Sequence, residues 1–223
     1  MRTIIIIPYR DRQENLEYFL NHSVPLLKKY ISNIKIVVVE QVPGKLFNRG
    51  LMLNIGFQEV EGENYFTHDV DINPLEHTIK DFYNKHINEN DIMGIYTSQC
   101  NTLGGIIKFK KSTFININGF PNNFWGWGCE DKDLQNRAEF KKVNITKNIL
   151  NNNPNKENYF TIFDDGGREM EISHSNFVYA QWKNLSDSDK EIYLENNGLT
   201  TLNYKKIKQE TLMEDVIKIT VEV

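Results

Sequence analysis

Cysteine, a positive charge balance and long apolar runs are all scarce in this chain. Only two of its 223 residues are cysteines, Cys100 and Cys129, which excludes a disulfide-rich secreted scaffold and favours a reducing compartment. Lys and Arg number 26 against 30 Asp and Glu, for a formal net charge of -4. A nucleic-acid partner, which a basic stripe would indicate, is therefore not expected.

Signals for export or membrane insertion are also lacking. Met1-Arg2-Thr3 leads directly into a short apolar segment, and no apolar stretch approaches the ~20 residues that a membrane span needs. We therefore expect a cytoplasmic protein without a membrane segment, unless a membrane stem has been removed from the natural chain.

Apolar runs alternate with helical patterns along the chain. A length of 223 residues fits one domain, which we take to be residues 1–223. Buried strands are predicted at 4–7 and 34–39, further strands at 65–66, 91–96 and 105–109, and helices at 13–29, 48–60, 130–140 and 186–195. Residues 148–158 resemble a loop, 164–167 a turn and 216–223 a half-buried edge strand. The alternation predicts an α/β fold with a mainly parallel central sheet and flanking helices, whose ligands bind beyond the carboxyl ends of the strands.

The densest chemical signal lies at residues 122–133. Two Trp-Gly pairs, 125–126 and 127–128, run directly into Glu130 and Asp131. Glycine lets backbone approach a ligand closely, indole offers a flat apolar face, and carboxylates accept hydroxyl hydrogen bonds or a proton. This combination indicates a sugar site. The alternative is a surface turn with a packed indole and solvated acids.

A carboxylate pair follows the predicted strand at 65–66. Asp69 and Asp71 lie on one face of an extended segment, with Val70 on the other. Such a pair can hold a hard divalent cation that in turn binds a diphosphate. Taken alone, however, the triplet is common and carries little information.

Arginines occupy two neighbouring segments of the same predicted rim. Arg10 and Arg12 follow the first strand, and Arg49 follows Phe47 at the start of a helix. Guanidinium groups suit phosphate oxygens, and the Phe47 ring could face a base. Surface arginines paired with nearby acids are the alternative.

His174 and Glu171 form a further candidate pair, because both could converge on one metal ion from an extended segment. A lone histidine is more often packed or solvated. The sequence cannot bring this pair together with the distant aspartates.

Taken together, these segments resemble the catalytic domain of the β-1,4-galactosyltransferases, glycosyltransferase family 7. The resemblance covers nearly the whole chain and keeps the family's motif order. It rests on residues 6–12, 47–49, 53–57, 69–71, 104–105, 117–123, the Trp-Gly run, 174–175 and 198–199. The implied fold is the nucleotide-sugar-binding GT-A type.

The resemblance implies a nucleotide pocket lined by Pro8, Arg10 and Arg12. Phe47 and Arg49 would lie beside the uridine and the phosphates of a UDP-sugar donor. The implied activity is metal-dependent, inverting transfer of a hexose to a glycan or another hydroxyl acceptor.

The same resemblance implies the reaction centre. Asp71 and His174 would bind the metal, usually manganese, and Asp69 would contact the donor. Trp127 would lie between the donor and acceptor sugars. Asp131 would be the catalytic base, and Glu130 would hold the donor sugar or the acceptor. The acceptor surface is expected at Trp127, Gly128, Glu130, Asp131 and Lys132.

Departures from the family pattern bear on specificity. Glu171 stands where the family often has Met, and a harder ligand suits magnesium as well as manganese. Thr102 replaces a large Tyr before the Gly104-Gly105 pair of the donor site, which leaves room for the N-acetyl group of UDP-GalNAc or UDP-GlcNAc. Lys132 replaces an Asp that helps to grip the acceptor. Two alternatives therefore stay open: a sugar-binding relative with little turnover, and a UDP-sugar hydrolase.

Overall fold

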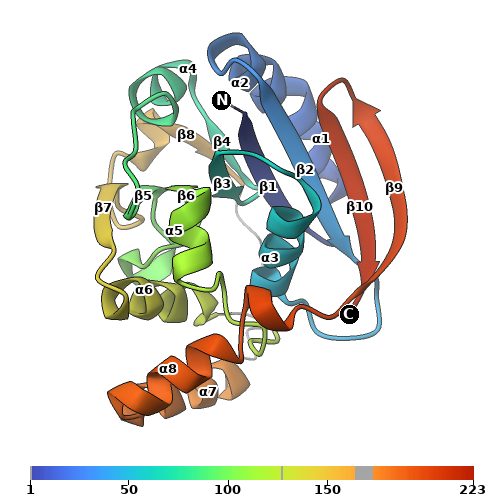
Figure 1. Cartoon of the computed structure of the whole chain (residues 1–223). Helices are drawn as coiled ribbons and strands as arrows, with labels where there is room; N and C mark the ends of the chain where they lie inside the picture. The colour runs from blue at the N-terminus through green and yellow to red at the C-terminus, as the bar shows by residue number, and fades with distance from the viewer. Residues whose placement is uncertain (1, 127, 164–172) are drawn as a thin grey trace.

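The computed structural model describes residues 2–126, 128–163 and 173–223 (Figure 1). The strands are β1 (Thr3–Tyr9), β2 (Ile34–Gln41), β3 (Asn64–His68), β4 (Ile72–Pro74), β5 (Asp91–Tyr96), β6 (Ile106–Lys110), β7 (Asn144–Ile149), β8 (Phe160–Ile162), β9 (Lys205–Met213) and β10 (Val216–Glu222).

Eight of these strands form one sheet in the order β7-β5-β6-β3-β1-β2-β10-β9, and β4 pairs with β8 separately. β1 lies at its centre and runs parallel to β2 and β3. The β-branched run from Ile4 to Ile7 is fully buried, as expected for a strand covered on both faces. β10–β2 and β5–β7 are also parallel, whereas β6 and β9 pair antiparallel with their neighbours.

Helices and turns connect the strands. They are α1 (Gln13–Tyr18), the π-helical η1 (Phe19–Ser23), α2 (Val24–Tyr30), α3 (Arg49–Glu59), α4 (Glu76–Thr78), the π-helical η2 (Ile79–Tyr83), η3 (Gln99–Asn101), α5 (Lys111–Asn116), α6 (Glu130–Phe140), η4 (Lys156–Asn158), α7 (Ser173–Asn184), α8 (Asp187–Glu195) and η5 (Leu199–Thr201). Two of the predicted helices begin at side-chain caps, because Asn48 accepts from the Leu51 amide and Ser186 from the Asp189 amide.

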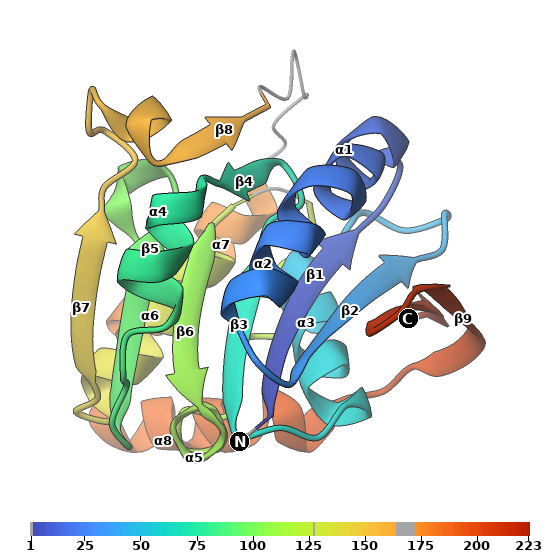
Figure 2. The same ribbon diagram turned by 90° about the horizontal axis from the view of Figure 1, so that it is seen from above.

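The helices cover both faces of the large sheet (Figure 2). One core joins alternate residues of β1 and β2 to α3, α5 and α6, and the other joins the remaining alternate residues to α1, η1, α2 and η2. α3 packs so closely that a side chain at Gly56 would meet Ile6 Cγ2 at 2.3 Å. Glycine at this position therefore permits the helix to lie directly on the sheet.

The end of the chain differs from the expectation. The segment predicted as an edge strand, 216–223, forms β10 inside the sheet between β2 and β9. β9 is the edge, and its first five residues are exposed, so it shows no buried pattern that the sequence could reveal. The predicted loop at 148–158 includes the end of β7 and the turn η4. The turn expected at 164–167 lies outside the described residues.

Candidate functional site

The carboxyl ends of β1 and β3 bring two of the predicted clusters together. Because these parallel strands are neighbours, the segment after Tyr9 meets the segment after His68. Arg12 Nη1 lies 2.9 Å from Asp71 Oδ2, and the two side chains are only 14% and 18% exposed. The sequence alone did not distinguish a binding site from ordinary surface charges, whereas the fold brings Arg12 and Asp71 into direct contact.

Arg49 joins the aspartate turn to the acids of α6. Its Nε lies 2.8 Å from Asp69 Oδ1, and its Nη1 lies 3.5 Å from Glu130 Oε1. Burial alone would lower the pKa of Arg49, but the carboxylates of Asp69 and Glu130 outweigh it and raise that pKa. The guanidinium is therefore a permanent cation between two carboxylates.

Glu130 is 8% exposed at the first turn of α6. Burial raises the pKa of its carboxyl, the adjacent Asp131 raises it further, and Arg49 opposes both. Two neighbouring carboxyls with different surroundings are a common arrangement at sites of proton transfer.

Asp131 is held by three donors. Its Oδ2 accepts from the hydroxyls of Ser98 and of Thr102, the latter at 2.9 Å, and its Oδ1 accepts from the Lys132 amide at 2.8 Å. A side chain at Gly104 would come within 2.9 Å of the same Oδ2. The carboxylate is thus fixed against the residues that flank the η3 turn and against the segment that leads into β6.

Gly105 and Lys132, which were predicted to line the donor and acceptor sites, contact different neighbours. Gly105 has a φ of +62°, and its carbonyl accepts from the Asp69 amide at 3.0 Å, which ties the two predicted donor segments together. The Lys132 Nζ lies 5.8 Å from the centre of the Tyr179 ring on α7.

The Trp-Gly run approaches the predicted nucleotide segment. The Gly126 amide donates to the Phe47 carbonyl at 2.9 Å. Gly126, Gly128 and Cys129 have φ values of 84°, 102° and 73°, a left-handed backbone for which glycine is the usual residue. Trp127 lies outside the described residues, while the Trp125 ring lies 5.6 Å from Lys45 Nζ.

Arg10 points to the same segment rather than to the aspartates. Its Nη1 donates to the Lys45 carbonyl at 2.7 Å, and its guanidinium carbon lies 5.2 Å from the centre of the Phe47 ring. Pro8 is buried inside β1. The predicted donor residues therefore follow one rim, from β1 across to the start of α3.

Buried amides fix the loop that carries the Trp-Gly run. Asn48 Nδ2 donates to the Asn122 carbonyl at 2.8 Å, and Asn54 Nδ2 donates to the Phe120 carbonyl at 2.8 Å. Asn122 Nδ2 reaches the Gly198 carbonyl at 2.7 Å. These bonds pin the loop between α3 and η5.

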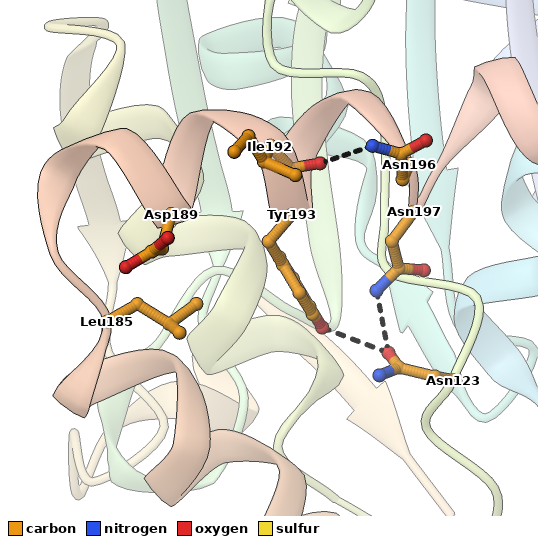
Figure 3. Close-up of a pocket in the computed structure, with 7 residues that line it drawn as sticks. All are labelled: Asn123, Leu185, Asp189, Ile192, Tyr193, Asn196 and Asn197. Carbon is orange, nitrogen blue, oxygen red and sulfur yellow. Dashed lines mark hydrogen bonds between the residues drawn. The ribbon is translucent and has the colours of Figure 1, made fainter.

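A shallow pocket of about 550 Å³ is formed by Asn123 of this loop together with residues of α8 and its flanking turns (Figure 3). Asn123 Oδ1 accepts from the Tyr193 hydroxyl at 3.1 Å and from Asn197 Nδ2 at 2.9 Å. α8 thus provides a second anchor for the Trp-Gly run.

The predicted metal ligands are described only in part. Glu171 lies outside the described residues, and His174 belongs to α7 but its side chain is not described. Within the described portion, no three His, Cys, Asp or Glu side chains form a metal cluster. The flanking residues do reach the site, because the Phe163 amide donates to the Asp71 carbonyl at 2.9 Å and Ser175 Oγ to the Trp125 carbonyl at 3.5 Å.

Two positioning residues escaped the sequence analysis. Ser98 contacts Asp131, yet an isolated serine in a loop carries no sequence signal. His68 is buried and bonds the Asp69 carbonyl through Nδ1 and the Tyr83 hydroxyl through Nε2, each at 2.9 Å. Burial lowers the pKa of His68 to about 4, so it is neutral at pH 7, and its place directly before the aspartates was the available signal.

Two family profiles match the chain along most of its length. Residues 1–84 match the N-terminal region of glycosyl transferase group 7, and residues 86–163 match a profile described as the N-terminal domain of galactosyltransferase. The chain belongs to glycosyltransferase family 7. The predicted resemblance is thereby confirmed.

Curated members of family 7 are similar over part of their length. Human β-1,4-galactosyltransferase 1 is 37% identical over 154 residues, which cover 66% of this chain and 39% of that protein. Cricetulus griseus β-1,4-galactosyltransferase 4 is 31% identical over 222 residues, which cover 94% of this chain and 60% of that protein. The chain thus spans less than two thirds of the length of these relatives.

Solved structures confirm the GT-A fold. The catalytic domain of Drosophila β1,4-galactosyltransferase 7 in complex with xylobiose has a TM-score of 0.76 at 23% identity, covering 100% of this chain and 94% of that chain. A mutant of that enzyme in complex with manganese, UDP-Gal and xylobiose has a TM-score of 0.77 at 22% identity, with the same coverage. Across the described residues, this family 7 chain has no helix both long and apolar enough for a membrane span.

Proposed function

We propose that residues 1–223 form one catalytic domain of a metal-dependent, inverting glycosyltransferase. It would move a hexose from a UDP-sugar to a glycan or another hydroxyl acceptor. The observation that carries the proposal is the connected chain of charge from Asp69 through Arg49 to Glu130 and Asp131. Membership of family 7 and the contribution of both β1 and β10 to one sheet support it.

The donor would bind along the rim of the parallel strands. Arg10 and Arg12 supply guanidinium groups for the diphosphate, and the Phe47 ring offers a face to the uracil. Pro8 shapes the floor from within β1, and Arg49 fixes Asp69 toward the donor. Gly105 leaves space for the sugar, and Trp127, which lies outside the described residues, would contribute between the donor and acceptor sugars.

Asp71 would be a protein ligand of manganese or magnesium, with His174 and Glu171 as the further ligands. Asp71 suits a hard divalent cation, because its carboxylate supplies oxygen ligands from a strand-end turn and its side chain is 18% exposed. When bound, the cation would neutralise the negative charge that develops on the departing UDP. The Drosophila enzyme mutant of similar fold was solved in complex with manganese and UDP-Gal, which supports a role for manganese in the proposed reaction.

Asp131 would act as the base. Its carboxylate takes the proton of the acceptor hydroxyl while that oxygen bonds to the anomeric carbon and the bond to UDP breaks. The electron pair of the broken bond leaves with UDP, and one displacement inverts the anomeric centre. Ser98 and Thr102 keep Oδ2 in place, and Gly128, Glu130 and Lys132 line the acceptor side.

Thr102 would widen the donor sugar site. Its hydroxyl donates to Asp131 Oδ2 at 2.9 Å, so it lies next to the proposed base. Its side chain is also much smaller than the tyrosine that the family pattern has at this position. We therefore propose that UDP-GalNAc or UDP-GlcNAc is accepted as well as UDP-Gal.

Both cysteines are free, which supports our proposal of a reducing, cytoplasmic setting for this chain.

Transfer assays with two variants test this function. With manganese, labelled UDP-sugars and a panel of sugar acceptors, Asp71→Ala and Asp131→Asn should each reduce transfer by about 10³-fold or more. Asp187→Asn, an exposed acid on α8, is the matched control and should keep the normal rate. Wild-type rates in both site variants would refute the assignment, and UDP release that no acceptor changes would indicate a hydrolase instead.

A further inference from the structure

Both carboxylates of the strand-end turn are engaged by arginine. Arg12 Nη1 lies 2.9 Å from Asp71 Oδ2, and Arg49 Nε lies 2.8 Å from Asp69 Oδ1. The Arg12 and Asp71 side chains are 14% and 18% exposed, so solvent screens their pairing much less than that of a surface ion pair. Asp71 thus carries a guanidinium at the carboxylate that the proposed function assigns to a metal.

A divalent cation and this guanidinium compete for the same carboxylate. A coordinated Mg²⁺ lies about 2.0–2.1 Å from its ligand oxygen, and Arg12 Nη1 is within hydrogen-bond distance of the same carboxylate. Two positive charges this close repel strongly where water is scarce. Asp71 can therefore bind a cation firmly only when Arg12 turns elsewhere or when its charge is compensated.

We propose that Arg12 guards Asp71 and couples cation binding to nucleotide binding. In this inference, which rests on the proposed function, the diphosphate of the nucleotide takes the Arg12 guanidinium through paired hydrogen bonds. Asp71 is then released to the cation. By linkage, each ligand strengthens the binding of the other.

Arg10 provides a matched control two residues away. Its guanidinium lies on the Phe47 ring and on the Lys45 carbonyl, 3.9 Å from the exposed Asp11 carboxylate. Removing Arg10 subtracts the same charge from the same segment without changing the Asp71 pairing. A general electrostatic effect would therefore appear in both variants, and a specific one only at Arg12.

The test is a titration of manganese chloride into the full chain without nucleotide, with free Mn²⁺ followed by electron paramagnetic resonance. Arg12→Gln should bind Mn²⁺ about tenfold more tightly than the wild type, because the competing charge is gone. Arg10→Gln should stay within about threefold of the wild type. An Arg12→Gln affinity equal to or below that of the wild type, or an equal gain in both variants, would overturn the inference.

The nucleotide arm separates this inference from the proposed function. UDP should strengthen Mn²⁺ binding more in the wild type than in Arg12→Gln, relative to the UDP–Mn²⁺ association measured without protein. If the wild type binds Mn²⁺ neither alone nor with UDP, the metal-dependent function fails. If the wild type transfers sugar with manganese but Arg12→Gln binds Mn²⁺ no more tightly, only the coupling fails. Thermal unfolding checks each variant, and Arg12→Met replaces Arg12→Gln should the latter not fold.

Discussion

Replacing Arg49 by methionine should lower the free energy of unfolding of the protein, because it removes the cation that lies between Asp69 and Glu130. Arg49 lies between Asp69 at 2.8 Å and Glu130 at 3.5 Å, and these side chains are 15%, 27% and 11% exposed. Methionine fills a similar volume but leaves two shielded carboxylates without their cation. Removal of one partner from a buried pair costs about 3–5 kcal/mol, a large share of the roughly 5–15 kcal/mol that stabilises a typical domain.

The loss should depend on pH with a definite sign. The folded-state pKa of Glu130 is raised by burial and by Asp131, while Arg49 opposes that rise. A raised folded pKa means that the group contributes stability below its unfolded pKa and loses it as the pH rises through the folded value. Without Arg49 the rise grows, so Arg49→Met should lose more stability relative to the wild type at pH 8 than at pH 5.

Urea unfolding at these two pH values measures both effects, with an unchanged m-value as the check for two-state behaviour. Lys208→Met, whose side chain is 61% exposed on the edge strand β9, is the control and should cost no more than about 0.5 kcal/mol, as for most surface changes. The double variant Arg49→Met/Glu130→Gln should recover part of the loss, because the uncompensated charge is removed. A loss of stability in Arg49→Met below about 1 kcal/mol, or one that shrinks from pH 5 to pH 8, would refute the argument that Arg49 stabilises the fold by pairing with Asp69 and Glu130.

Three further predictions concern the surroundings of Asp131. Thr102→Tyr should lower kcat/KM for UDP-GalNAc relative to UDP-Gal by about tenfold or more in donor-competition assays, because a larger side chain fills the space for the N-acetyl group; an unchanged ratio would contradict this. Ser98→Ala removes a hydrogen bond to the Asp131 carboxylate and should lower kcat by about 10–100-fold while calorimetric UDP affinity stays within about twofold; a normal kcat would show that the bond is dispensable. Gly104→Ala would place a methyl group 2.6 Å from Ser98 Cβ, so it should lower kcat at least as much as Ser98→Ala, and a wild-type rate in steady-state assays would exclude this tight packing.

The parts of the fold with a strong local pattern were predictable. The buried run at Ile4–Ile7 and the helix at 130–140, with acids in its first turn, were found as predicted. β9 was missed because its first five residues are exposed on both faces, so its sequence carries no apolar period. The internal place of β10 follows from its pairing with β2, a long-range choice that no local pattern records.

The site was predictable where residue types are distinctive and spaced in motifs. Asp69, Arg49 and Glu130 were all singled out, but their direct connection depends on α3 and α6 packing on the same face of the sheet. Ser98 could not be found, because its contact with Asp131 arises from the η3 turn rather than from its residue type. Local chemistry thus indicated the kind of site, and tertiary packing determined which groups act together.

The central claim is that a cation at Asp71 and a UDP moiety bind together on the rim of the parallel strands. Calorimetric titration of UDP into the protein, with manganese and then with EDTA, tests it most directly. The account predicts binding that weakens by about tenfold or more in EDTA, and that in Asp71→Ala is equally weak with manganese. UDP affinity that is the same under both conditions, or that the Asp71 substitution leaves unchanged, would contradict it.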